Sequence, residues 1–227
     1  HSGWSIERIF QLCFQRMNNI KNAPGASGPT PKNAPQFKKF LEAIKYLREL
    51  QTQDVLNLSY NNENGNPQIV LNITDEGKNL KAAQNFSRLL NLEPGLERYF
   101  ISFTQKQNGF GEIKVVTRSL LGVLFYLSQG VEAPQQDVNA GKVTRTLKKS
   151  GEVFDWKEVT GEILRVRSQS KRPENAALRV FYRGTWFFIK DSDLKSKSTF
   201  SLLSQIFSLQ AGKIKDNSPV LTLGVGQ

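Results

Sequence analysis

The sequence has almost none of the residues that histidine- or cysteine-based chemistry requires. It contains one histidine, His1, and one cysteine, Cys13, in 227 residues. We interpret residues 1–3 (His-Ser-Gly) as the remnant of a cleaved tag. A lone cysteine excludes an internal disulfide, and the chain offers no imidazole base to activate its thiol. Because Cys13 falls on the apolar side of a predicted helix, we expect a structural role for it.

Long apolar runs and nucleotide-binding loops are also missing. The longest apolar candidate, residues 120–127, is far shorter than the ~18 residues that a membrane span needs. No Gly-x-x-x-x-Gly-Lys-[Ser/Thr] phosphate loop occurs, and the glycines stand singly at turns. We therefore expect no transmembrane segment, no cofactor and no metal site in this chain.

Positive charge, by contrast, is abundant. The formal net charge is +11, and the excess is concentrated in residues 142–183. Basic and aromatic residues alternate there on adjacent predicted strands, which suits single-stranded nucleic acid or another anionic polymer. The competing interpretation is that the rings of residues 186–189, an unbroken apolar run, face the core. The candidate anion-binding surface consists of Arg165, Arg167, Lys171, Arg172, Arg179 and Arg183.

Apolar spacing predicts helices and strands in the first half of the chain. The predicted elements are, in order, a helix over 4–20, a Pro/Gly-rich loop over 22–35, a helix over 36–50, strands over 55–60 and 68–73, a helix over 75–90, and a hairpin of strands 99–103 and 113–117 around Asn108 and Gly109.

The second half begins with residues 120–131, which are apolar almost all round and free of charge. A helix of that kind is typically buried on most faces, so we predict that it is the central helix of the core. Later elements are strands over 143–147, 162–167, 177–182 and 185–189, read as an antiparallel meander with a tight turn at Arg183 and Gly184, then a helix from Ser198 or Thr199 to Gln210 and an edge strand over 219–223.

These elements predict an α+β fold, in which a mostly antiparallel sheet packs against a buried central helix and a C-terminal helix. Single helices interrupt pairs of strands, which does not match the βαβ alternation of a doubly wound sheet. The predicted organisation is an N-terminal helix in residues 1–21, a loop in 22–35 and one α+β domain in 36–227, with a sub-boundary near 98–117.

Several strings in the second half are unusual and occur in one order. They are Thr-Arg-Ser-Leu-Leu at 117–121, Phe-Tyr-Leu-Ser-Gln-Gly-Val-Glu-Ala-Pro at 125–134, Phe-Asp-Trp at 154–156, Tyr-Arg-Gly-Thr-Trp-Phe at 182–187, Asp-Leu-Lys-Ser-Lys-Ser-Thr-Phe at 193–200 and Pro-Val-Leu-Thr-Leu-Gly-Val-Gly at 219–226. Over residues 98–227 the chain resembles a family of uncharacterised bacterial proteins. The resemblance implies a bacterial protein, at the cell envelope where members carry an export or lipoprotein signal, and it implies no activity or site residues.

Acidic residues offer two weaker candidates for chemistry. Asp191 and Asp193 follow a predicted buried strand and can bind a divalent cation only with further oxygen ligands. The competing interpretation is turn and cap chemistry before the next helix. Lys190 and Ser192 also interrupt the more acidic string that the family resemblance leads us to expect there. Asp155, Glu158 and Glu162 flank Trp156, as in a sugar site, but also as in an ordinary strand–helix junction with a core aromatic.

Serine and lysine recur at the spacing of penicillin-binding enzymes in two places. Ser168 with Lys171 and Ser192 with Lys195 match it, but the Ser-Asp-Asn and Lys-Thr-Gly elements of that class are missing. The sequence therefore favours a non-enzymatic binding or assembly domain, with a protein or an anionic polymer as partner. The alternatives are nucleic-acid binding through the basic 142–183 region and a hydrolase that uses acidic residues.

Overall fold

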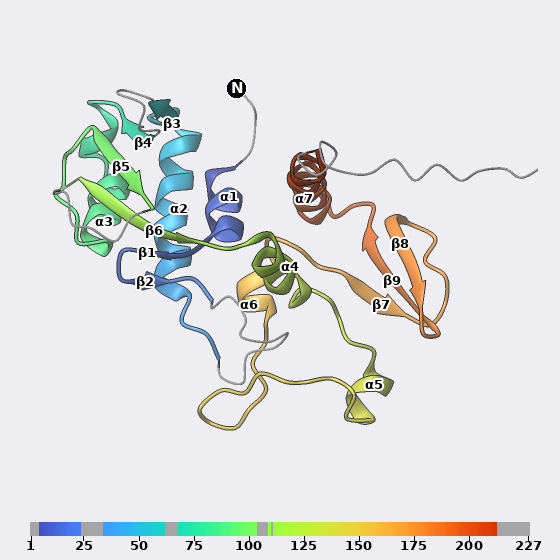
Figure 1. The fold of residues 1–227 in the computed structure, drawn as a ribbon. Coiled ribbons are helices and arrows are strands. Elements are labelled where there is room, and N and C mark those ends of the chain that lie inside the picture. Colours follow the sequence, from blue (N-terminus) through green and yellow to red (C-terminus); the bar gives the residue numbers. More distant parts are fainter. Residues whose placement is uncertain (1–4, 24–33, 62–67, 104–108, 110, 213–227) are drawn as a thin grey trace, which may run out of the picture.

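The computed structural model describes residues 5–23, 34–61, 68–103, 109 and 111–212 (Figure 1). Its helices are α1 (Ile6–Cys13), α2 (Lys38–Thr52), the 3-10 helix η2 (Gly77–Asn79), α3 (Lys81–Leu89), α4 (Leu120–Ser128), α5 (Gln135–Asn139), α6 (Lys157–Thr160) and α7 (Leu194–Gly212). Its strands are β1 (Phe14–Met17), β2 (Ile20–Lys21), β3 (Leu56–Asn61), β4 (Gln68–Ile73), β5 (Arg98–Ser102), β6 (Glu112–Thr117), β7 (Arg167–Gln169), β8 (Ala176–Tyr182) and β9 (Thr185–Lys190). The predicted α+β class is confirmed.

The first half of the chain forms a six-stranded sheet with the order β2-β1-β6-β5-β4-β3. All neighbouring strands are antiparallel except β5 and β6, which are parallel. Alternating residues of the central strands, such as Tyr99 and Ile101, are buried under α2 and α3. These helices present Phe40, Ile44, Leu47 and Phe86 to the same core, because apolar residues recur there at helical spacing. This half is therefore a sheet covered on one face by helices.

A second core lies around α4 and α6, and Leu12, Ala23 and Phe37 of the first half contribute to it. Val123, Tyr126 and Leu127 of α4 pack there with Phe154, Val159 and Ile163. A three-stranded sheet with the order β7-β9-β8 adjoins this core through Ile189, and α7 through Leu202. Figure 1 shows α4 and α6 between the large sheet on one side and the small sheet with α7 on the other. No helix in the described part of the chain is long and apolar enough to span a membrane.

The helix predicted over 4–20 ends early, at Cys13, and the prediction was wrong beyond that point. Phe14 continues directly into β1, and Asn18, with a φ of 46°, turns the chain into β2. Met17 and Ile20 lie opposite each other across this turn, and both are buried. Their spacing of three fits one helix face as well as a tight hairpin, so the apolar pattern did not distinguish the two.

The second predicted hairpin is also wrong. β5 and β6 run parallel, with Phe100 opposite Glu112, and a tight turn cannot join parallel neighbours. Each strand finds its antiparallel partner elsewhere, β5 in β4 and β6 in β1. Asn108 lies outside the described residues.

The helix predicted to be the buried centre of the core is only half covered. α4 buries Val123, Tyr126 and Leu127, but Leu121 is 58% exposed and Leu124 37% exposed. The large sheet packs against α2 and α3 instead.

Other boundaries shift by a few residues. α3 begins at Lys81 after a 3-10 turn, and α7 begins at Leu194, where Asp193 accepts hydrogen bonds from Ser196. The meander is a β8–β9 hairpin with β7 on the far side of β9, and residues 143–147 and 162–166 form only isolated bridges. The predicted strand over 219–223 lies outside the described residues.

A buried arginine joins the two halves. Arg118 lies between β6 and α4, and its guanidinium donates to the backbone carbonyls of Gln11, Leu12, Phe14, Asn22 and Ala23 at 2.7–3.1 Å. Its Cζ also lies 4.3 Å from the centre of the Tyr126 ring. Burial lowers the pKa of Arg118 to about 10, so the group remains charged at neutral pH. The positive charge therefore caps the carboxyl end of α1, where the chain enters β1 without a loop.

Replacement of this guanidinium should destabilise the protein strongly. Arg118→Met fills similar volume but removes the donor of five buried carbonyls, of which Gln11 and Phe14 keep the Asn22 amide, and we expect a loss of at least about 3 kcal/mol in the free energy of unfolding. Arg98→Met, on an exposed side chain of β5, is the matched control and should change the value by less than about 0.5 kcal/mol. Denaturation in guanidinium chloride measures both, and equal stability of the two variants would contradict this role.

Candidate binding surface

The small sheet separates its side chains into two faces of different character. Cross-strand partners share a face, so Arg167, Phe188 and Arg179 form one row, and Gln169, Trp186 and Phe181 form the next. Lys190 follows on the same side of β9. We call this the basic–aromatic face; its residues are Arg167, Gln169, Arg179, Phe181, Trp186, Phe188 and Lys190. The opposite face carries Leu178, Val180, Tyr182, Phe187 and Ile189.

The connection between β7 and β8 lies on the basic–aromatic face. β7 and β8 flank β9 on opposite sides, so residues 170–175 must cross β9. Pro173 is buried, and its carbonyl accepts a hydrogen bond from Arg179. The guanidinium of Arg172 lies 5.9 Å from the centre of the Trp186 ring, within the range of a cation–π contact. The crossing loop thus adds Lys171 and Arg172 to this face.

Aromatic surface remains open at the turn end of the sheet. The ring of Phe181 is 55% exposed and lies 5.0 Å from that of Trp186, which is half-buried. Arg183 and Gly184 form the turn with φ values of 49° and 79°, as a two-residue hairpin requires. Phe188, by contrast, is buried. Of the run 186–189, Ile189 belongs to the core around α4 and α6, whereas Phe188 is buried on the basic–aromatic face and Trp186 and Phe187 are half-buried.

Positive charge predominates in this part of the molecule. Residues 165–190 contain seven basic residues and one acidic residue, Glu174. Lys171, Arg172, Glu174 and Lys190 line an open hollow of about 520 Å³ beside the crossing loop. Among the described residues, none of the cations on this face or its loop forms an ion pair.

Of the six predicted anion-binding residues, the structure brings four together. Arg167, Arg172 and Arg179 share the basic–aromatic face, and Lys171 borders its hollow. Arg183 is exposed at the turn. The sequence prediction omitted Lys190, although its even spacing from Trp186 and Phe188 along one strand was a usable signal.

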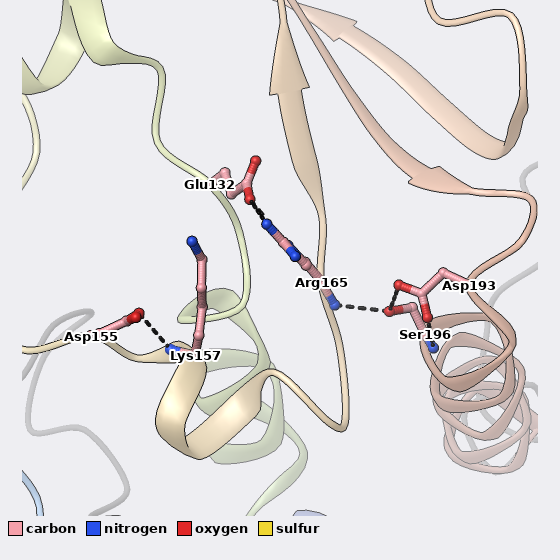
Figure 2. Close-up of polar contacts among 6 residues, drawn as sticks. All are labelled: Glu132, Asp155, Lys157, Arg165, Asp193 and Ser196. Atoms are coloured by element: carbon pink, nitrogen blue, oxygen red, sulfur yellow. Dashed lines mark hydrogen bonds and ion pairs between the residues drawn. The ribbon is translucent and has the colours of Figure 1, made fainter.

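Arg165 has a different role. Its Nε and Nη2 donate to Oε1 of Glu132 at 3.1 and 2.9 Å, and its backbone N–H donates to Ser196 Oγ at 2.9 Å (Figure 2). Ser196 in turn donates to both carboxylate oxygens of Asp193. This network links the segment before β7 to the segment after α4 and to α7, so the charge of Arg165 is paired with Glu132.

Three more of the carboxylates proposed for chemistry have local partners, as Asp193 does. Asp155 accepts from the backbone N–H of Lys157, Glu162 pairs with Lys195, and Asp191 pairs with Lys197 (Figure 2 shows the first). A hollow of about 160 Å³ does bring Asp155 and Trp156 next to Glu132 and Arg165. No group of three or more metal-binding side chains occurs within the described ranges.

The structure also shows where the remaining candidate nucleophiles and their lysines lie. Cys13 is half-buried at the end of α1, and burial raises the pKa of its thiol, which disfavours the reactive thiolate. Ser168 lies on β7 with its side chain on the face opposite Arg167, while Lys171 belongs to the crossing loop. Ser168 therefore faces away from Lys171. Lys195 forms an ion pair with Glu162, so neither lysine is placed as a base for its serine.

No protein-family model, no curated protein and no solved structure matches this chain. The candidate surface is therefore interpreted from its own geometry.

The junction that holds the small sheet depends on a close backbone approach at Gly130. A Cβ atom there would lie 2.3 Å from the Leu164 carbonyl oxygen, while the Gly130 carbonyl accepts from Val166 N–H. We predict that Gly130→Ala lowers the free energy of unfolding by about 2 kcal/mol.

Gly122→Ala, in α4, is the matched control. Its Cβ would meet other atoms at ordinary contact distances, and it should be neutral or stabilising by about 0.5 kcal/mol. Thermal denaturation of both variants tests the pair, and we expect only Gly130→Ala to lower the stability. Equal stability of the two variants would show that the junction tolerates a wider spacing.

Proposed function

We propose that this chain is a non-enzymatic binding module whose basic–aromatic face holds single-stranded nucleic acid. The observation that carries the proposal is the cluster at the turn end of the small sheet. There the exposed ring of Phe181 lies beside Trp186, and the guanidinium of Arg172 lies over Trp186.

The aromatic rings of this cluster are suited to bases, and the cations beside them are suited to phosphates. Bases stack on exposed aromatic rings irrespective of sequence, and each such stack contributes about 1–3 kcal/mol. The cations Lys171, Arg172, Arg179 and Lys190 are free of acidic partners in the described structure and lie on the same face. They are placed to contact the phosphates of a strand whose bases stack at Phe181.

The described structure favours this function over the hydrolase alternative. Asp155 serves as a cap and Glu162 and Asp191 are ion-pair partners, whereas the cations of the basic–aromatic face and its loop form no ion pair among the described residues. The bacterial origin and the cell-envelope location implied by the family resemblance remain predictions, and the nucleic-acid proposal does not depend on them.

Salt dependence tests the electrostatic part of the proposal. Four phosphate contacts on a single strand predict a slope of about −2.8 for log K against log salt, or about a 50-fold loss of affinity between 50 and 200 mM. Fluorescence anisotropy with a labelled oligothymidine of about 12 nucleotides measures it. An affinity independent of salt, or no binding at the lower concentration, would overturn the proposal.

A pair of ring truncations on one strand tests the stacking part. Phe181→Ala should weaken oligothymidine binding about 5- to 150-fold, because it removes one stacking surface. Tyr182→Ala is the control: its ring is 62% exposed on the opposite face of β8, and its loss should leave the affinity unchanged. Equal effects of the two variants would show that bases do not stack on the basic–aromatic face.

A further inference from the structure

The outer edge of β8 is open along its whole length. In the described structure β8 pairs only with β9, and no backbone group bonds to its other side. Residues 177–182 are exposed, and four of them are large and apolar: Leu178, Val180, Phe181 and Tyr182. An exposed apolar edge strand is a template for pairing with another strand unless charges or a bulge protect it. Here the only charge between Leu178 and Tyr182 is Arg179, and the register irregularity of β8 lies before this stretch, between Ala176 and Leu178.

The hairpin determines which backbone groups point outward. A two-residue turn closes on a hydrogen-bonded pair, which here is Tyr182 with Thr185. Hydrogen-bonded and non-hydrogen-bonded pairs alternate along antiparallel strands, so Val180 bonds to Phe187. The N–H and C=O groups of Arg179 and Phe181 therefore point away from β9, toward the open edge.

We propose that β8 pairs antiparallel with β8 of a second copy of this chain, with Val180 on the two-fold axis. In this register Arg179 of each copy exchanges both backbone hydrogen bonds with Phe181 of the other copy. The two small sheets become one six-stranded sheet. This dimer goes beyond the proposed function and does not depend on it.

Side-chain complementarity selects this register over its neighbours. Centred on Val180, each Arg179 meets a Phe181 ring of the second copy on one face. On the other face Val180 meets Val180, and Leu178 meets Tyr182, which covers the exposed apolar residues. Centred on Arg179, the same strands would place two like charges directly opposite, which is destabilising. The strand is thus complementary to itself in one register.

Charge also determines how the association responds to salt. Each copy carries +11, so two copies repel at low ionic strength, and salt screens that repulsion. Dimerisation should therefore strengthen as salt rises, whereas binding of nucleic acid should weaken. The two opposite trends keep a failure of this inference separate from a failure of the proposed function.

Analytical ultracentrifugation of the whole chain tests the dimer. We expect a reversible monomer–dimer equilibrium whose association constant increases between about 0.1 and 0.5 M salt. Val180→Lys places two cations on the axis and should weaken dimerisation at least about 10-fold. Val153→Lys is the matched control, because Val153 is 50% exposed against 60% for Val180 and lies far from β8 in the sequence. A chain that stays monomeric, or a dimer equally sensitive to both substitutions, would overturn the inference.

Cysteine cross-linking tests the register. Non-hydrogen-bonded partners have Cα atoms about 4.5 Å apart, which permits a disulfide. Val180→Cys should form a covalent dimer when diamide takes up the two protons and two electrons that the thiols release. Leu178→Cys should not, because each Leu178 lies opposite Tyr182 of the second copy. Val153→Cys controls for random collision and for Cys13. Cross-linking of Leu178→Cys as fast as Val180→Cys would contradict the proposed register.

Discussion

The fold depends on a single buried positive charge. Helix α1 passes directly into β1 without a glycine cap, and the guanidinium of Arg118 donates to the carbonyls of Gln11 and Leu12 in its last turn. The same group bonds to the carbonyls of Asn22 and Ala23 and lies against Tyr126 of α4. One side chain thereby joins the amino-terminal helix and hairpin to the helix that begins the second half. Because it donates only to neutral carbonyls, its charge costs desolvation that five hydrogen bonds must offset.

A series of contacts connects Arg118 to the small sheet. Arg118 and its neighbours position α4, and Gly130, in the turn after α4, accepts a hydrogen bond from Val166 N–H. The ion pair of Glu132 with Arg165 and the bonds of Ser196 then orient β7 and α7 (Figure 2). The small sheet is thus held at one end, while its β8–β9 hairpin projects with both faces of β8 exposed. The proposed binding surface lies on this exposed hairpin and the crossing loop.

Local sequence patterns predicted the strands and turns that local interactions determine. The β3, β4, β8 and β9 strands and the turn at Arg183 and Gly184 follow from alternation and turn chemistry, and the basic residues of the small sheet were recognised before their arrangement was known. The pairing of β6 with β1 and the role of Arg118 depend on contacts about a hundred residues apart, which no local pattern records. The sequence likewise did not distinguish Arg165, fixed by Glu132, from Arg167, on the basic–aromatic face, because both alternate with apolar neighbours in the same way.

The central claim is that the small sheet, and not the larger one, is the binding surface. Backbone amide chemical shifts, recorded while an oligothymidine is added to the isotope-labelled chain at low salt, test it most directly. The account predicts shift changes confined to residues 167–190, largest at Phe181, Trp186 and the crossing loop, with the amides of β3 to β6 unchanged. Changes centred on the six-stranded sheet, or none in the β8–β9 hairpin at saturating oligonucleotide, would contradict it.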